Sequence, residues 1–280
     1  MQPSIRLTIL VENSVHTRKL RAEHGLAILI EARGRRVLFD TGQTDLVLAN
    51  AAALGLSLEN LDAIVLSHGH DDHTGGLAAV CRQSPRARVL LHPAARAEKY
   101  SGNAAGPPRP IGLPPAAQQA LAAAGANVVL TSQAEEVIAG VFVTGEIPRR
   151  TDFEDVGGCF FLDAAGQRPD PLSDDQALYF PTAAGLVVVL GCAHAGVVNT
   201  LLQIEALTAS QRIRAIIGGL HLLQASPARL KATLAALRRR QVALLMPGHC
   251  TGAVATARLW SEFPGSCRGA GTGTTLLFPA

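Results

Sequence analysis

Seven consecutive residues, Ser67-His68-Gly69-His70-Asp71-Asp72-His73, bring three imidazoles and two carboxylates together. They follow the apolar run at residues 63–66, which is typical of a buried strand. A neutral imidazole is a common metal ligand because its ring nitrogen donates well to a borderline metal ion. Packing alone does not explain so many polar groups at the end of a strand. The stretch therefore predicts a metal-binding turn, against the alternative of a polar turn that is merely rich in histidine.

The spacing of these side chains also indicates how many ions the turn could hold. The pattern His68-x-His70-x-Asp72-His73 offers ligands on both sides of the turn, so two metal ions could lie a few ångströms apart. Imidazole and carboxylate together suit zinc, iron or manganese and need no thiolate. We expect zinc, as one or two ions, with manganese or iron as alternatives.

Other histidines occupy equivalent places along the chain. His194, His221 and His249 each follow a short apolar run, as His68 does, and a helical pattern comes after each of them. In layered α/β folds, loops at the ends of strands converge from distant parts of the chain. We therefore expect the histidines at these four strand ends to meet in one place.

The composition is that of a globular α/β protein. The chain has 280 residues, of which 48% are hydrophobic and 17% charged, enough for a sizeable core. A net charge of +3 gives no reason to expect a nucleic-acid or membrane partner. The five cysteines form no CxxC pair and predict reduced thiols. No signal-peptide pattern is present, and no apolar run reaches the roughly 20 residues of a membrane helix, so we expect a cytoplasmic protein.

Strand and helix patterns alternate along the chain and predict a single domain over residues 1–280, with a loop-rich excursion at about residues 93–182. The Gly- and Pro-rich stretch at residues 101–115 predicts a loop or lid. A helix is expected over residues 45–54, with Asp45 as its N-cap. Further helices are expected over residues 116–124, 197–207 and 227–240.

The histidine stretch resembles the HxHxDH signature of the metallo-β-lactamase superfamily. Gly-Cys-Ala-His194 and Pro-Gly-His249 match its downstream histidine motifs in order, and Asp40 matches its early strand-end aspartate. The resemblance covers roughly residues 5–278. It implies an α/β fold, a four-layer αββα sandwich, that binds one or two metal ions between its two sheets.

Carried over by position, the resemblance implies two sets of metal ligands. His68, His70 and His194 would bind one metal, and Asp72, His73 and His249 would bind the other. The superfamily usually has a bridging aspartate between the last two histidine motifs, but this chain has no aspartate between residues 194 and 249. His221 stands there instead, as a metal ligand, as a donor to the substrate or leaving group, or as a structural residue.

Further segments are similar to one branch of the superfamily. They are Asn13, the loop Gly145-Glu146-Ile147-Pro148-Arg149, and the sequences that follow Asp174, Gly191 and His249. Members of this branch are commonly named after the dihydropterin–ribofuranosylaminobenzene-phosphate synthase, and many are called simply metal-dependent hydrolases. His70 stands where flavodiiron proteins have glutamate, which argues against a redox di-iron role.

We therefore expect a metal-dependent hydrolase acting on a small ester, lactone or phosphorylated molecule. Asp72 and His221 are the expected catalytic residues. Asn13, Glu146 and Arg149 are candidate contacts for an anionic substrate, although an arginine in a loop can equally be solvated. A synthase-like transferase is the alternative, and a non-catalytic metal-binding or sensing module is a third hypothesis. The oligomeric state is not predicted.

Five further side chains leave alternatives open or are expected to be inert. Cys192 is either a thiolate ligand or a buried packing residue. Cys250 is expected to pack away from the site. His24 and His92, like His16, are expected to be structural or exposed.

Overall fold

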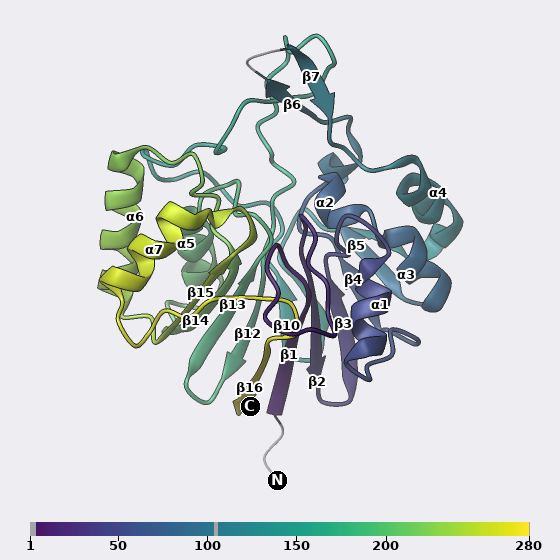
Figure 1. The fold of residues 1–280 in the computed structure, drawn as a ribbon, viewed down its shortest axis with the longest axis horizontal. Coiled ribbons are helices and arrows are strands. Elements are labelled where there is room, and N and C mark those ends of the chain that lie inside the picture. The colour runs from purple at the N-terminus through teal and green to yellow at the C-terminus, as the bar shows by residue number, and fades with distance from the viewer. Residues whose placement is uncertain (1–3, 104–105, 280) are drawn as a thin grey trace.

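The computed structural model describes residues 4–103 and 106–279. Two β-sheets lie face to face at its centre, and helices cover the outer face of each sheet (Figure 1). The predicted four-layer αββα sandwich is therefore confirmed. Both ends of the described chain lie at the edge of the sandwich opposite the β6–β7 hairpin, Tyr100–Asn103 and Gly106–Pro110 (Figure 1).

The first sheet combines antiparallel and parallel pairing. Its first three pairings are antiparallel and its last three are parallel. In spatial order its strands are β16 (Thr275–Pro279), β1 (Ser4–Val11), β2 (Ala27–Ala32), β3 (Arg35–Phe39), β4 (Ala63–Val65), β5 (Arg88–Leu91) and β8 (Val128–Leu130).

The second sheet has a parallel half and an antiparallel half. Its parallel half contains the three strands that precede His194, His221 and His249. In spatial order its strands are β15 (Leu244–Gly248), β14 (Ile213–Gly219), β13 (Gly185–Leu190), β12 (Leu178–Thr182), β10 (Val141–Val143) and β9 (Glu135–Ile138).

The core follows the two-residue alternation of the strands. In β4, Ala63 and Val65 face the apolar layer between the sheets, whereas Ile64 packs on the helix side. Because both faces of this strand are buried, its sequence is apolar throughout. The strand that leads to the histidine stretch is therefore packed against apolar side chains on both of its faces.

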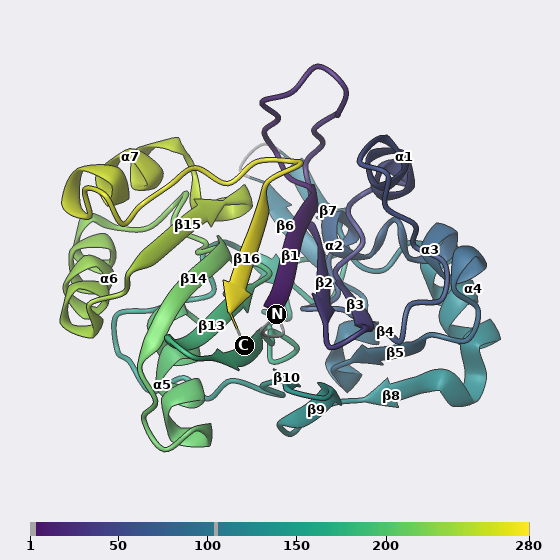
Figure 2. The ribbon, with the colours of Figure 1, turned by 90° about the horizontal axis from the view of Figure 1, so that it is seen from below.

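Helices cover the two outer faces, as the view from below shows clearly (Figure 2). On the first sheet they are α1 (Leu46–Ala53), α3 (Leu77–Gln83) and α4 (Pro115–Ala124). On the second sheet they are α5 (Val197–Leu207), α6 (Pro227–Arg240) and α7 (Ala253–Glu262). The shorter helices are α2 (Asp71–Thr74), η1 (Pro93–Arg96), η2 (Gly125–Asn127) and η3 (His249–Thr251).

The prediction of an irregular loop at residues 101–115 was wrong in part. Strands β6 and β7 form a hairpin there, and the hairpin pairs with the two-residue strand β11 (Phe160–Phe161). Because β7 contains Pro and Gly, its sequence does not show a strand pattern, yet both residues are tolerated in an edge strand. This small sheet stands above the sandwich on the side of the histidines (Figure 1).

The N-cap position of α1 is occupied by Asp45, as predicted. Asp45 precedes the helix but makes no side-chain capping bond. Instead Leu46 N donates to Thr44 Oγ1 over 3.1 Å, one residue earlier. Within residues 4–103 and 106–279, no helix combines the length and apolar character needed to cross a membrane.

Candidate metal centre

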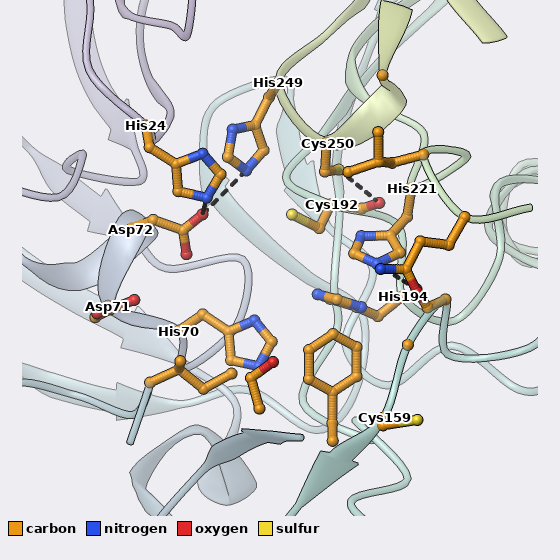
Figure 3. A pocket seen from close by; sticks show the side chains of 18 of the residues that line it. His24, His70, Asp71, Asp72, Cys159, Cys192, His194, His221, His249 and Cys250 are labelled. Atoms are coloured by element: carbon orange, nitrogen blue, oxygen red, sulfur yellow. Dashed lines mark hydrogen bonds and ion pairs between the residues drawn. The ribbon is translucent and has the colours of Figure 1, made fainter. Parts of the chain in front are cut away.

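Histidines from four strand ends line one pocket, where Figure 3 labels His70, His194, His221 and His249. The ring centroid of His194 lies 4.8 Å from that of His68 and 4.1 Å from that of His221. The centroids of His73 and His249 are also 4.8 Å apart. Both sheets contribute, because β4 belongs to the first sheet and β13, β14 and β15 belong to the second.

His68, His70 and His194 form the first cluster. His68 Nε2 lies 3.0 Å from His70 Nδ1, and the centroids of His70 and His194 are 4.9 Å apart. All three rings are buried. Burial, reinforced by neighbouring histidines, lowers the pKa of His68 and of His194 well below the usual value, and burial also lowers that of His70. These three rings are therefore neutral and have lone pairs available.

Asp72, His73 and His249 form the second cluster. Asp72 Oδ2 lies 3.2 Å from His249 Nε2 and 3.6 Å from His73 Nε2, and the two Nε2 atoms are 3.0 Å apart. Burial opposes ionisation of Asp72, but the charge of His73 and hydrogen bonds from His24 and His249 outweigh it and hold the pKa of Asp72 well below its usual range. Asp72 therefore carries a negative charge within this cluster.

Four rings are oriented by acceptors that leave a lone pair facing the site. In its neutral form, His73 donates its Nδ1 hydrogen to Asp40 Oδ2 over 2.7 Å. His194 Nδ1 donates to the Val156 carbonyl over 2.9 Å, and His249 Nδ1 donates to Asn13 Oδ1 over 3.0 Å. His68 Nδ1 donates to Ser67 Oγ over 2.9 Å, and that hydroxyl donates to Asp40 Oδ2 over 2.7 Å. With Nδ1 as the donor, the neutral form of each ring has its lone pair on Nε2, which is the state a metal requires.

The side chains of Asp174, Asp175 and Gln176 hold the two loops that carry His68 and His194 by bonding to backbone groups of those loops. Asp174 Oδ2 accepts from Gly69 N over 2.8 Å, and Asp175 Oδ2 accepts from Ala195 N over 2.7 Å. Gln176 Nε2 donates to the Leu66 carbonyl over 2.9 Å. This acidic segment, which the sequence singled out only by resemblance, therefore fixes the loops of both sheets against each other.

Left-handed backbone turns aim several of these side chains. His221 has φ of 46°, His249 has φ of 49° and Asp40 has φ of 58°. Such conformations cost of order 1–3 kcal/mol for residues other than glycine and gather at functional sites. Glu12 holds the His249 turn, because His249 N donates to Glu12 Oε1 over 2.5 Å.

The donor set fits a divalent metal. Ligands about 2.0–2.1 Å from a tetrahedral zinc ion lie about 3.3 Å apart, close to the 3.0 Å spacings within both clusters. Within the described residues, the buried atom His194 Nε2 has no hydrogen-bond partner. A bound cation would satisfy an unpartnered nitrogen here, because buried polar atoms otherwise require a partner.

Three further residues lie near the clusters, and one of them, Cys250, contradicts its prediction. His24 is exposed, in agreement with the expectation, but its Nε2 lies 3.2 Å from Asp72 Oδ2. The hydrogen bond to Asp72 raises the pKa of His24 and outweighs burial, which lowers it. Cys192 Sγ lies 3.2 Å from His73 Nε2. Cys250 was expected to pack elsewhere, but its Sγ lies within 4.8 Å of Cys192 Sγ and a ring nitrogen of His221. The turn at His249 redirects Cys250, and an extended-strand rule does not capture that turn.

The predicted substrate residues lie in different places. Asn13 lines the pocket above the clusters and bonds to His249. Glu146 is half exposed and lies 3.7 Å from His92 Nε2, which was expected to be structural or exposed and is buried. Arg149 donates to the Pro171 carbonyl, and Arg150 donates to Gln203 Oε1. Glu146, Arg149 and Arg150 are not among the pocket-lining residues.

The pocket has a volume of about 760 Å³ and opens between the clusters and the hairpin. Phe160 forms part of its wall, with its ring centroid 5.3 Å from that of His70 and 5.2 Å from that of His194. Arg109 of β7 lies on the opposite rim, 3.9 Å from Asp71. His221 also lines the pocket, where its Nε2 contacts the Gly157 carbonyl over 3.2 Å.

An αββα sandwich with this donor set at its strand ends defines a metallo-β-lactamase fold with a candidate divalent metal centre. A model of the metallo-beta-lactamase superfamily matches residues 20–158 of the chain. The chain belongs to this superfamily, which consists largely of enzymes that act on small molecules and bind divalent metals.

Two relatives come from Methanocaldococcus jannaschii. A 7,8-dihydropterin-6-methyl-4-(beta-D-ribofuranosyl)-aminobenzene-5'-phosphate synthase is 30% identical over 256 residues, covering 86% of this chain and 85% of the relative. An uncharacterised protein is 31% identical over 255 residues, covering 90% of this chain and 93% of the relative. Among solved structures, a metal-dependent hydrolase of the beta-lactamase superfamily matches with a TM-score of 0.83 and 32% identity, over 97% of this chain and 98% of that one.

Proposed function

We propose that the protein is a metal-dependent hydrolase that acts on a small ester, lactone or phosphorylated molecule. One observation carries this proposal: two clusters of buried side chains, each with ligand atoms 3.0 Å apart, lie at the floor of an open pocket. A purely structural metal site is normally closed by four protein ligands, whereas a catalytic site leaves room for water and substrate.

The metal we propose is zinc, held as one or two ions by the first and second clusters. When bound, zinc supplies Lewis acidity and lowers the pKa of water in contact with it. His68, His70 and His194 would hold one ion, and Asp72, His73 and His249 would hold the other. Manganese or iron remain alternative occupants of the same nitrogen and oxygen donors.

Asp72 has the role of positioning water and accepting its proton. Its carboxylate is 8% exposed, is ionised and lies at the pocket floor. His221 is the candidate to stabilise negative charge that develops on the substrate. Burial alone lowers the pKa of His221, but neighbouring Cys250 outweighs burial and raises it, which favours the cationic form of the ring.

An anionic substrate is favoured by the rim of the pocket. Arg109 is exposed there, and a guanidinium pairs well with phosphate or carboxylate. Asn13 can contribute an amide near the second cluster. Glu146 and Arg149 remain proposed substrate contacts only if the loops that carry them move toward the pocket.

A synthase is the second candidate. It is favoured by the 30% identity to the dihydropterin synthase over most of the chain. The pocket also offers Phe160, an aromatic ring on which a flat heterocycle could stack. A transferase of this kind would join two substrates with release of pyrophosphate.

The deciding experiment compares these reactions on one preparation of zinc-loaded protein. Phosphodiesters, lactones and a dihydropterin pyrophosphate are each incubated alone and with an aminobenzene ribosyl phosphate. Hydrolysis without a second substrate supports the hydrolase, and a coupled product supports the synthase. A chelated, folded protein that turns over at the full rate contradicts both candidates.

A further inference from the structure

Cys192 lies between the two clusters and is close to both. Its Sγ and ring nitrogens of His68 and His194 all lie within 4.8 Å of one another, and the same holds for Cys192, His73 and His249. We propose that Cys192 is a metal ligand shared by the two clusters. Its thiolate would then take the role of the bridging aspartate that the chain lacks. This inference extends the metal centre proposed above and does not depend on which reaction that centre catalyses.

A hydrogen bond to His73 does not account for the whole arrangement. Cys192 is 3% exposed, and its Sγ contacts His73 Nε2 over 3.2 Å, so a thiol proton could occupy that contact. His194 Nε2, in a residue that is 1% exposed, nevertheless has no partner within the described part of the chain. Its lone pair belongs to the same group of ligand atoms as Cys192 Sγ. A cation between them satisfies both atoms, and a hydrogen bond to His73 satisfies only one.

The backbone is shaped to bring both side chains to the site. Strand β13 ends at Leu190, so Cys192 and His194 lie beyond it and are not related by strand alternation. Ala193, between them, has φ of 56°, which carries the strain expected of a left-handed alanine. Ala195 N is fixed by Asp175 at the end of the turn. The strained turn keeps Cys192 facing the clusters.

Charge supports a thiolate at this position. The two clusters contain one carboxylate, Asp72, so their ligands supply a single negative charge to balance the charge of two divalent ions. When Cys192 binds, its S–H bond breaks, a metal–sulfur bond forms and the proton leaves to solvent, with no change of oxidation state. A thiolate adds a second negative charge and selects thiophilic ions such as zinc, cobalt or cadmium over manganese.

Cobalt titration of the full-length protein tests the proposal. Cobalt(II) bound to thiolate has a strong near-ultraviolet charge-transfer absorption that nitrogen and oxygen ligands do not produce. We expect this band in the wild-type protein as cobalt is added. Cys192→Ser should lose the band and bind the second ion roughly tenfold or more weakly. Cys192→Asp should bind two ions again, but without the band.

Matched controls separate Cys192 from the other thiols. Cys81→Ser and Cys267→Ser, whose thiols are not among the candidate metal-binding groups, should keep the full band. Loss of the band in Cys250→Ser but not in Cys192→Ser would overturn the proposal. The ¹¹³Cd NMR shift of the cadmium-loaded wild-type protein, which requires no variant, should be that of a thiolate-ligated ion. Two bound ions without sulfur signatures contradict this inference alone, whereas no metal binding at all contradicts the proposed function.

Discussion

At the scale of single residues, the site depends on which ring nitrogen of each histidine carries hydrogen. Asp40 controls this for two rings, His73 directly and His68 through Ser67. Such outer partners fix the tautomer and the angle of a ligand and typically change metal affinity by about 10–100-fold. The early strand-end aspartate is therefore a positioning residue.

Asp40→Asn should weaken metal binding to the second cluster by about 10–100-fold, because its amide nitrogen cannot accept the His73 Nδ1 hydrogen. Binding to the first cluster should fall less, since Ser67 can still contact His68. Isothermal titration calorimetry with zinc measures both steps. Equal affinities in the variant and the wild type would show that Asp40 does not orient the ligands.

Metal binding should also depend on pH through His73. Burial lowers its pKa, but Asp72 and Asp40 outweigh burial and raise that pKa to about 9 in the metal-free protein. Below that pH the ring is protonated, and a metal must displace the proton. Affinity at the second cluster should therefore rise with pH and level off near pH 9. Calorimetry in buffers of different ionisation enthalpy should detect the proton release, and a pH-independent affinity would contradict this.

At the scale of elements, the site depends on how closely the end of β13 approaches the loop after β4. Gly191 allows this approach. A Cβ built on Gly191 would lie 2.1 Å from Ser67 Oγ and 3.2 Å from Asp40 Oδ2. Real side chains do not tolerate the shorter distance, so a methyl group must push the two sheets' loops apart.

Gly191→Ala should therefore reduce metal content while the protein still folds. The methyl group displaces Ser67, and through Ser67 it disturbs Asp40 and His68. We expect a loss of about 1–3 kcal/mol in the free energy of unfolding from overpacking. Circular dichroism melts and metal analysis measure the two effects. Gly34→Ala is the control for added bulk, because a Cβ there meets no atom within 4 Å, although its φ of 76° carries backbone strain of its own.

Local sequence patterns predicted the elements that carry the ligands well. The boundaries of α5 and α6 agree with the predicted helices at residues 197–207 and 227–240, because long helices have a repeated apolar face. Strands β9 and β12 were missed. Acidic residues in β9 and Pro181 in β12 obscure a strand pattern that cross-strand pairing determines.

The candidate site was predicted only in part. The histidines at strand ends could be found because apolar strands precede them. His24 could not be found in this way, since it lies on a long loop. The path of that loop depends on hydrogen bonds that Asn13 Oδ1 accepts from Gly25 N and from His249 Nδ1. Cys250 was misplaced because sequence does not reveal the left-handed turn at His249.

At the scale of the whole molecule, each cluster joins the two sheets. His68 and His70 follow a strand of the first sheet, whereas His194 follows a strand of the second. The second cluster is divided in the same way between α2 and the turn at His249. A bound metal therefore links the two halves of the sandwich and stabilises only the folded state.

Chelation should lower the melting temperature of the protein. A ligand at 100 times its Kd stabilises the folded state by about 2.7 kcal/mol, which corresponds to roughly 5–10 °C for a chain of this size class. Differential scanning calorimetry before and after chelation, and after zinc is restored, measures the shift. His68→Ala is the control and should show a smaller response to chelation. An unchanged melting temperature would mean that the clusters do not bind metal tightly.

We expect that the buried clusters hold a metal that the reaction requires. The most direct test restores zinc stepwise to chelated protein and measures bound zinc and turnover in the same samples. We predict no turnover at zero zinc, a rise in proportion to zinc bound up to at most two ions per chain, and no rise in folded His194→Ala. Full turnover by metal-free, correctly folded protein would contradict the account.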